Sequence, residues 1–154
     1  MSDSKTKIKE ILAVLNAMFI LADENNPLSI QEYVKGIKQG YGLDVDRRRV
    51  SQILNDLYDI QKEEPDYFIY FKIRGCKKGK GKIYAEKFFD VDDGVKLIKA
   101  VKSSSELTKG ESFELINYIY LLFTENQREE IKKRLWKKHP FLTDHVPNYN
   151  LAHY

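Results

Sequence analysis

The feature that most constrains this chain is an amphipathic helix predicted over residues 47–57, which opens with three consecutive arginines. On a helical wheel of about 100° per residue, its apolar residues fall on one side: Val50, Ile53, Leu54 and Leu57. The other side collects polar side chains, namely Arg48, Ser51, Gln52 and Asn55. Donors and amides of this kind suit base edges in the major groove of DNA. The pattern also fits a solvated charged face on an ordinary core helix.

A second feature lies downstream, where residues 67–74 alternate in the manner of a β-strand, with Tyr67, Ile69, Phe71 and Ile73 on one face. Glycines at positions 75, 79 and 81 can then turn the chain into a short return strand over residues 82–85. This predicted hairpin carries only cations among its charged residues from 72 to 82: Lys72, Arg74, Lys77, Lys78, Lys80 and Lys82. Phosphate is the ligand that such a cluster suits, and a plain lysine-rich surface turn is the alternative.

The composition of the 154 residues fits a folded protein, with 42% hydrophobic residues and a formal net charge of +3. This length suits one domain or two small ones. The cations gather around residues 47–49 and 72–87, and for nucleic-acid binding their distribution matters more than their total. The one cysteine, Cys76, cannot form an intrachain disulfide, which favours a reducing compartment. We therefore expect a cytoplasmic protein.

The N-terminal segment has the outline of a secretion signal, because lysines precede an apolar run over residues 11–22. The run is too short to span a bilayer, it contains Asn16, and acidic Asp3 and Glu10 precede it. A first helix buried on most sides explains it better. No other segment approaches transmembrane length, so no membrane association is expected.

The elements between these features follow a definite order. A turn cluster at residues 23–27 precedes a second helix, which is predicted to run from a capping box of Ser29 and Glu32 to Gly40 or Gly42. Asp46 can cap the arginine helix, and Pro65 separates that helix from the hairpin. Two helices, a short turn, a third helix and a basic hairpin are the layout of a winged helix-turn-helix.

The second half of the chain is helical in pattern. Residues 92–101 have apolar side chains at helical spacing, serines at 103–105 mark a loop, and Thr108 or Lys109 begins another helix. From Phe113 to Phe123 that helix is apolar nearly all round, so it either forms the centre of the helical half or is partly covered by a second subunit. A last helix over residues 125–136 has two predicted ion pairs, Glu129 with Lys133 and Glu130 with Arg134.

Three stretches, together with this order of elements, carry a resemblance to a known family. They are Leu-Ser-Ile-Gln-Glu at 28–32, Tyr-Gly-Leu-Asp-Val-Asp-Arg-Arg-Arg-Val at 41–50 and Leu-Ile-Lys-Ala-Val-Lys-Ser-Ser at 97–104. Roughly residues 8–136 resemble the front half of bacterial WYL-domain transcriptional regulators. In such proteins a winged helix-turn-helix reads DNA, a helical segment follows, and a C-terminal WYL domain senses a ligand and helps dimerisation.

The resemblance implies a DNA-reading role for Arg47, Arg48, Arg49, Ser51, Gln52 and Asn55, and phosphate contacts for Lys77, Lys78, Lys80 and Lys82. No WYL domain fits in the residues after Trp136. The chain is therefore expected to be either a piece of a longer regulator or a short protein that keeps only the DNA-binding half. In the second case, ligand sensing does not carry over.

The sequence thus predicts a mainly α protein with a small β-hairpin wing, divided into a winged helix-turn-helix at residues 1–88 and a helical extension at 89–154. We expect a transcription regulator that binds double-stranded DNA sequence-specifically. Its third helix would present Arg48, Gln52 and Asn55 to base edges, with Arg47 and Arg49 near phosphates or bases. This interpretation requires that the arginine end and the lysine tip of the hairpin form one contiguous positive ridge.

The alternative is a winged-helix module that binds protein, as an inhibitor or adaptor, which the acids late in the third helix favour: Asp56, Asp59, Glu63 and Glu64. An enzyme is not expected, because all three histidines lie in the tail and no phosphate loop or cysteine cluster is present. No metal, cofactor or small-molecule ligand is predicted. The apolar helix at 113–123 can support a homodimer or complete a monomeric core.

Overall fold

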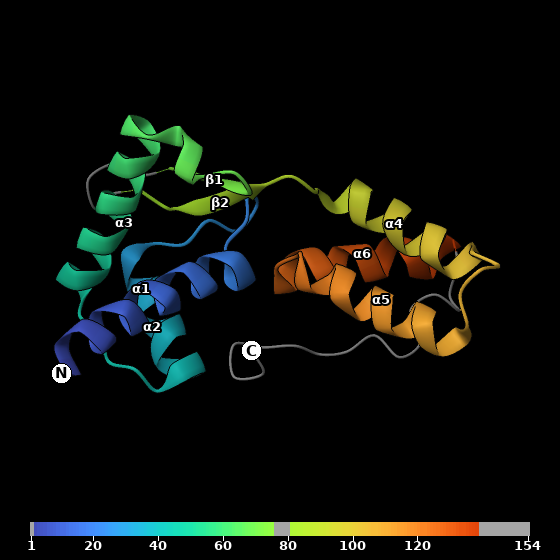
Figure 1. Cartoon of the computed structure of the whole chain (residues 1–154), viewed down its shortest axis with the longest axis horizontal. Helices are drawn as coiled ribbons and strands as arrows, with labels where there is room; N and C mark the ends of the chain where they lie inside the picture. Colours follow the sequence, from blue (N-terminus) through green and yellow to red (C-terminus); the bar gives the residue numbers. More distant parts are fainter. Residues whose placement is uncertain (1, 76–80, 139–154) are drawn as a thin grey trace. The chain divides into compact units, whose positions relative to one another are not determined.

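The computed structural model describes residues 2–75 and 81–138, which fold into two compact units. The first unit comprises residues up to Phe88, and the second begins at Phe89. Both are helical, and a two-stranded antiparallel hairpin belongs to the first (Figure 1). The prediction of a mainly α protein with a small β-hairpin is confirmed at this level.

Unit 1 has three helices ahead of its hairpin. They are α1 (Ser2–Leu21), α2 (Ile30–Tyr41) and α3 (Arg47–Glu63). A 3-10 turn, η1 (Pro65–Tyr67), leads from α3 to strands β1 (Phe71–Arg74) and β2 (Tyr84–Lys87). The three helices pack against one another, β1 packs against α3, and β2 packs against α1.

The ends of α2 lie where the sequence predicts them. Ser29 Oγ accepts a hydrogen bond from the Glu32 N–H at 3.2 Å, and Glu32 Oε1 accepts one from the Ser29 N–H at 3.1 Å. This reciprocal pair is the predicted capping box. The helix stops at Gly42, whose φ of 65° is in the left-handed region that favours glycine. A polar capping box thus determines the start of this helix, and the backbone freedom of a glycine determines its end.

The apolar run of α1 is buried as predicted. Every position from 11 to 22 is buried or half-buried except Leu12, whereas residues 3–9 are exposed. α1 therefore contributes its second half to the core and leaves its lysine-rich first half outside. Across the part of the chain that the structure describes, none of the helices combines the length and apolar character needed to cross a membrane.

The first strand is shorter than the predicted 67–74. Pro65 opens η1, which delays regular pairing until Phe71. Tyr67 and Ile69, predicted on the same strand face as Phe71 and Ile73, are 73% and 64% exposed. The Gln61 side chain accepts from the Ile73 N–H at 2.6 Å and donates to the Ile73 carbonyl at 3.1 Å. A side chain of α3 therefore determines where β1 lies.

The return strand also differs from the predicted 82–85, since β2 begins at Tyr84. Ile83 pairs instead with Leu28, through N–H···O distances of 3.1 and 2.7 Å. The hydroxyl of buried Tyr33 donates to the Ile83 carbonyl at 2.8 Å. The segment that precedes α2 is thereby tied to the base of the hairpin, a long-range contact for which the local sequence gives no signal.

Gly75 ends β1 at a position that only glycine can occupy. Its φ of 82° lies in the left-handed region, and a Cβ built there would lie 2.0 Å from the carbonyl oxygen of Lys82. The two arms of the hairpin therefore approach each other closely just beyond the paired strands.

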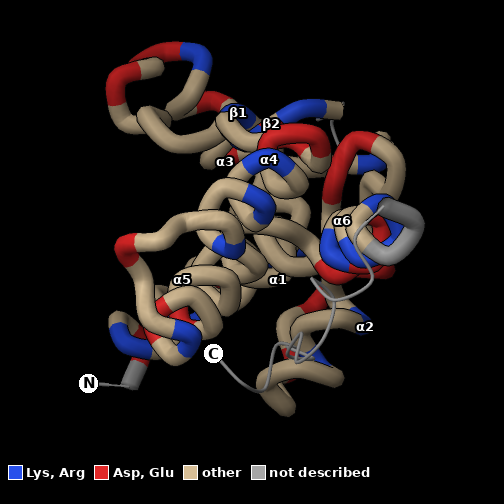
Figure 2. Tube along the Cα trace, turned by 90° about the vertical axis from the view of Figure 1, so that its right-hand side faces the viewer, with Lys and Arg blue, Asp and Glu red and all other residues tan. Residues whose placement is uncertain are grey.

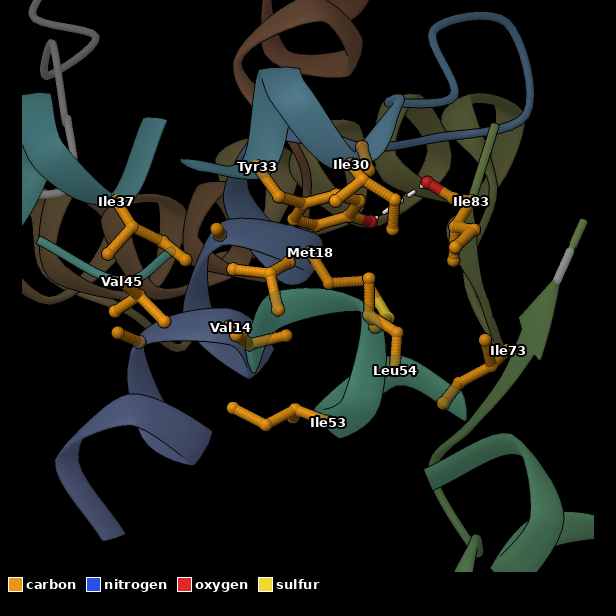
Figure 3. Packing of buried hydrophobic residues seen from close by; sticks show 14 of the residues in the cluster. Val14, Met18, Ile30, Tyr33, Ile37, Val45, Ile53, Leu54, Ile73 and Ile83 are labelled. Carbon is orange, nitrogen blue, oxygen red and sulfur yellow. Dashed lines mark hydrogen bonds between the residues drawn. The ribbon is translucent and has the colours of Figure 1, made fainter. Parts of the chain in front are cut away.

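The core of unit 1 draws on all three helices and on both arms of the hairpin (Figure 3). Its largest fully buried side chains include Val14 and Met18 from α1, Tyr33 and Ile37 from α2, Leu54 from α3, and Ile73 and Ile83 from the hairpin arms. The predicted apolar face of α3 is confirmed, because Val50 and Ile53 are also buried and Leu57 is half-buried. Burying this face holds α3 in place and leaves its polar side outward.

Unit 2 consists of α4 (Val91–Ser103), α5 (Lys109–Leu121) and α6 (Glu125–Lys138). α5 begins at Lys109, one of the two starts expected from the sequence, and a capping box of Thr108 and Glu111 precedes it. α4 packs against both other helices around the buried residues Ile98, Ile116, Tyr120, Phe123, Ile131 and Leu135. Gly94 allows the close approach of α4, since a Cβ there would lie 2.7 Å from the Ile131 side chain.

α5 is buried along one side rather than all round. Three of its apolar side chains, and that of its C-cap residue Leu122, are between 40% and 57% exposed in the described part of the chain: Phe113, Leu115, Tyr118 and Leu122. The predicted pair of Glu130 and Arg134 forms, at 3.2 Å. Glu129 pairs with Lys132 at 3.1 Å instead of the predicted Lys133, so that prediction was wrong in register. Residues i+3 and i+4 are both helical neighbours, and spacing alone does not choose between them.

Candidate nucleic-acid interface

α3 begins at the arginine run because Asp46 caps it. The Asp46 Oδ1 accepts from the Arg49 N–H at 2.8 Å, which satisfies one of the free donors of the first turn. No acid lies within that first turn. Cations at a helix N-terminus oppose the helix macrodipole, so three arginines there weaken the isolated helix. A bound anion would reverse the sign of this effect.

The structure brings five of the six predicted α3 residues onto one outward surface, which we call the α3 polar face: Arg47, Arg48, Ser51, Gln52 and Asn55. Arg47, Arg48 and Gln52 are exposed, while Ser51 and Asn55 are half-buried. Asn55 Nδ2 donates to Ser51 Oγ at 3.4 Å. Residues three and four apart share a side of a helix, so Arg48, Gln52 and Asn55 form a row over the first two turns.

Arg49 differs from the other two arginines. Its Nε donates to Glu10 Oε1 of α1 at 3.1 Å, and the two side chains are only 25% and 17% exposed. A second donor, Nη1, binds Gln52 Oε1 at 3.3 Å. The expectation that Arg49 reaches a phosphate or base is therefore not supported by its position, because a half-buried carboxylate already binds its guanidinium.

The second half of α3 carries the opposite charge. Four acids and one lysine lie from residue 56 to residue 64, at positions where all are exposed: Asp56, Asp59, Lys62, Glu63 and Glu64. Figure 2 draws aspartate and glutamate positions red and lysine and arginine positions blue along the Cα trace. A polyanion can approach α3 only over its first two turns, since the remainder would repel phosphate.

The hairpin carries three of its predicted cations within the described residues, and these are not equivalent. Lys72, Arg74 and Lys82 are all exposed, but Arg74 Nε pairs with Glu86 Oε2 across the strands at 2.6 Å. The hydrogen bond from Glu86 and then its negative charge raise the pKa of Arg74. Arg74 therefore stays protonated, and the charge of Glu86 lies beside it. The predicted contacts of Lys77, Lys78 and Lys80 lie outside the described residues.

Lys82 lies near the start of α2. The pKa of Glu32 is lowered mainly by its hydrogen bonds with Ser29, and the positive charge of Lys82 contributes to the same shift. The base of the basic hairpin thus faces the N-terminus of α2, where free N–H groups also favour an anion.

The base of the hairpin joins α3 at the end opposite the arginines. Gln61, which binds Ile73, lies fourteen residues after Arg47. At a rise of about 1.5 Å per residue, this is about 21 Å along the helix axis. The arginine end and the hairpin base are therefore separate positive surfaces of unit 1. The predicted ridge joins the arginine end to the lysine tip of the hairpin. That tip contains residues 76–80, which lie outside the described residues.

Two residues of this surface are absent from the sequence-based prediction. Glu10 binds Arg49 and Glu86 binds Arg74, and each carboxylate takes a predicted DNA-contacting arginine. Glu86 could have been found by pairing the two arms of the hairpin, because it lies opposite Lys72 in the observed register. Glu10 lies 39 residues from its partner in a different helix, so no local pattern indicates it.

The described residues contain no group of three or more histidine, cysteine, aspartate or glutamate side chains that could hold a metal ion. Comparisons with protein families, with curated sequences and with solved structures give no significant match for this chain.

Proposed function

We propose that this chain is a transcription regulator that binds double-stranded DNA, with unit 1 acting as a winged helix-turn-helix. Three helices and a hairpin in this order support that architecture. The short pairing of Leu28 with Ile83 also favours it, since this pairing joins the helices to the hairpin through a sheet-like contact. On this proposal, α3 is the recognition helix and the hairpin is the wing.

The observation that carries the proposal is the α3 polar face, which combines exposed cations with exposed amide and hydroxyl groups on one side of a helix whose other side is buried. Arg48 and Gln52 are residue types that bind guanine and adenine edges. Arg47, at the first position of α3, suits a phosphate beside the groove.

The charge gradient along α3 sets the docking direction. The arginine end enters the groove, and the end with Asp59, Glu63 and Glu64 points away from the phosphates. In this orientation the acids select against a helix laid along its full length in the groove. Lys72 and Lys82 then supply wing contacts to phosphate, whereas Arg74 contributes little because Glu86 holds it.

For unit 2 we propose the role of a helical segment that supports assembly. The exposed apolar side chains of α5 and its C-cap residue offer a surface for a homodimer: Phe113, Leu115, Tyr118 and Leu122. Sedimentation at micromolar concentration tests this role, and a monomer at that concentration refutes a stable dimer. A dimer would bind two half-sites about 34 Å apart, or a multiple of that distance.

Selection of bound sequences from random duplex DNA tests the function as a whole. A DNA-reading α3 yields an enriched motif, and Gln52→Ala and Arg48→Ala each change the preference at one or two positions within it. Lys96→Ala, which removes an exposed lysine of unit 2, is the matched control and leaves the motif intact. Failure of the unaltered chain to retain any duplex at low salt refutes the proposal.

A second function, binding of a protein partner, has one observation in its favour. Three large side chains stand exposed at the end of η1 and in the link to β1, namely Tyr67, Ile69 and Tyr70, at 64% to 74%. They lie beside the acidic end of α3, and an acidic surface with exposed aromatics suits a basic partner rather than DNA. A low-salt gel shift with random duplex separates the two functions, since only the DNA-binding function predicts a shift.

A further inference from the structure

The first half of α1 extends past the core of unit 1 at the end where α3 begins. Its residues 3–9 are exposed, and the first residue of α1 that packs against the core is Ile11. At this end the two helices are joined by the ion pair of Glu10 with Arg49, at 3.1 Å. The N-terminal turns of α1 thus lie near the first turns of α3 (Figure 1). A long ligand that covers the start of α3 therefore comes close to α1 as well.

Three lysines in this half of α1 are available to an anion. Lys5, Lys7 and Lys9 are exposed, and none of them forms an ion pair with another described residue. Glu10, one of the two acids in the segment, is held by Arg49. The segment is therefore positive, and a phosphate chain is the partner whose charge it complements.

The three lysines do not project in the same direction. Lys5 and Lys9 precede Asn16 by eleven and seven residues, about three and two helical turns, so they share its side of α1. Asn16 Nδ2 donates to the hydroxyl of Tyr41 in α2 at 2.7 Å, which identifies this side as the one toward α2. Lys7 precedes Asn16 by nine residues, about 900° of rotation, and therefore lies on the opposite side.

Lys7 continues the row of α1 that enters the core. Ile11, Val14 and Met18 follow it at spacings of four, three and four residues, and Val14 and Met18 are fully buried. Figure 3 shows these two side chains in one packed group with Leu54 of α3. Because this row leaves the core beside the first turn of α3, Lys7 overhangs the end of α3 that carries the arginines.

We propose that Lys7 binds a DNA phosphate at the edge of the groove that α3 enters, so that α1 is a second element of the DNA interface. The proposal rests on the proposed function. Packed helices lie about 8 to 10 Å apart, and the major groove is about 12 Å wide. A helix packed beside the recognition helix therefore lies over a backbone that borders the groove.

The residue type fits this position. A lysine ammonium is a point charge with three donors, which suits phosphate and does not distinguish bases by a fixed pattern of bonds. Lys7 thus adds affinity without choosing the sequence. Glu10 and Arg49 are positioning residues in this arrangement, since their ion pair holds α1 against the first turn of α3.

Salt titration of the full chain on its selected duplex tests the proposal. Lys5→Ala is the matched control, because it removes an exposed lysine of the same helix from the opposite side. Lys7→Ala should lower the slope of log affinity against log salt concentration by about 0.9, which corresponds to about eightfold weaker binding at about 0.1 M salt. Lys5→Ala should leave the slope unchanged. The enriched sequence motif should be the same for both variants and the unaltered chain.

A second measurement assigns the contact to one phosphate. Each phosphate of the selected site is replaced in turn by an uncharged methylphosphonate. One such replacement, beside the base whose preference depends on Arg48, should weaken binding of the unaltered chain and of Lys5→Ala. The same replacement should have no further effect on Lys7→Ala, because the contact is already lost.

Two results overturn the proposal and leave DNA binding by α3 in place. One is an unchanged salt slope in Lys7→Ala. The other is an equal loss of slope in Lys5→Ala and Lys7→Ala, which would show that α1 acts only through its diffuse charge. Absence of binding of the unaltered chain to any duplex overturns the proposed function, and this proposal with it.

Discussion

Replacing Tyr120 by phenylalanine should stabilise unit 2, which is an unusual result for a change at the centre of a core. Tyr120 is fully buried on α5, and its hydroxyl has no hydrogen-bond partner among the described residues. A buried polar group without a partner costs about 1 to 3 kcal/mol. Because Tyr120→Phe removes only the hydroxyl, the free energy of unfolding should rise by about that amount at pH 7.

The pH dependence gives a second, independent signature. Burial, followed by the negative charge of Glu129, raises the pKa of Tyr120 from 10.0 to about 12. The unfolded chain then ionises at lower pH than the folded one, so stability is complete below pH 10 and falls as the pH rises toward 12. At about 1.4 kcal/mol per pKa unit, the loss is at most about 3 kcal/mol. Screening by water reduces it.

Urea unfolding followed by tryptophan fluorescence measures both effects, because the one tryptophan of the chain, Trp136, belongs to α6 of unit 2. Tyr118→Phe is the matched control on the same helix, since Tyr118 is 57% exposed, and it should change stability by less than about 0.5 kcal/mol. The reasoning is wrong if Tyr120→Phe unfolds at the same or lower urea concentration at pH 7. It is equally wrong if the variant loses as much stability as the unaltered chain between pH 9 and pH 11.

Three further predictions concern unit 1. The double variant Arg47→Ala with Arg48→Ala should reduce the slope of log affinity against log salt concentration by up to about 1.8, since each phosphate contact contributes about 0.9. A salt titration on duplex DNA measures this slope, and an unchanged slope removes these arginines from the interface. Asp46→Ala should lower the free energy of unfolding by about 1 kcal/mol through loss of the α3 cap. Asp46→Asn keeps a capping oxygen, so its free energy of unfolding should stay close to that of the unaltered chain. Urea unfolding followed by circular dichroism measures both values. Gly75→Ala should be more destabilising than Gly42→Ala in the same assay. Both glycines have positive φ, for which alanine costs about 1 to 2 kcal/mol. Only at Gly75 would a Cβ meet a backbone carbonyl oxygen, at 2.0 Å. Equal losses of stability in the two variants would contradict the close approach of the hairpin arms at Gly75.

The helical part of this fold could be predicted from the sequence because the responsible interactions are local. The capping box of Ser29 and Glu32, the cap at Asp46 and the glycine stop at Gly42 all involve residues within a turn of one another. The apolar spacing from Val50 to Leu57 likewise predicts which side of α3 is buried, because a helix has one geometry.

The hairpin itself was predicted, but the ends of its two strands were not, because they depend on interactions that are not local. Alternation of apolar and polar residues is the same over 67–74 whether pairing starts at Tyr67 or at Phe71. The choice is made by Gln61 from α3 and by the pairing of Ile83 with Leu28. Strand register depends on partners that are distant in the sequence, and the periodicity of one segment does not contain them.

The residues of the candidate interface are likewise determined partly by local interactions and partly by long-range packing. The order of residues alone determines that three arginines begin a helix whose outward side bears Ser51, Gln52 and Asn55, since helical geometry and a local cap are sufficient for that. Only the packing of α1 against α3 decides that Arg49 belongs to Glu10 rather than to a ligand. A charged side chain binds the nearest opposite charge in space, and which charge is nearest is a property of the folded chain.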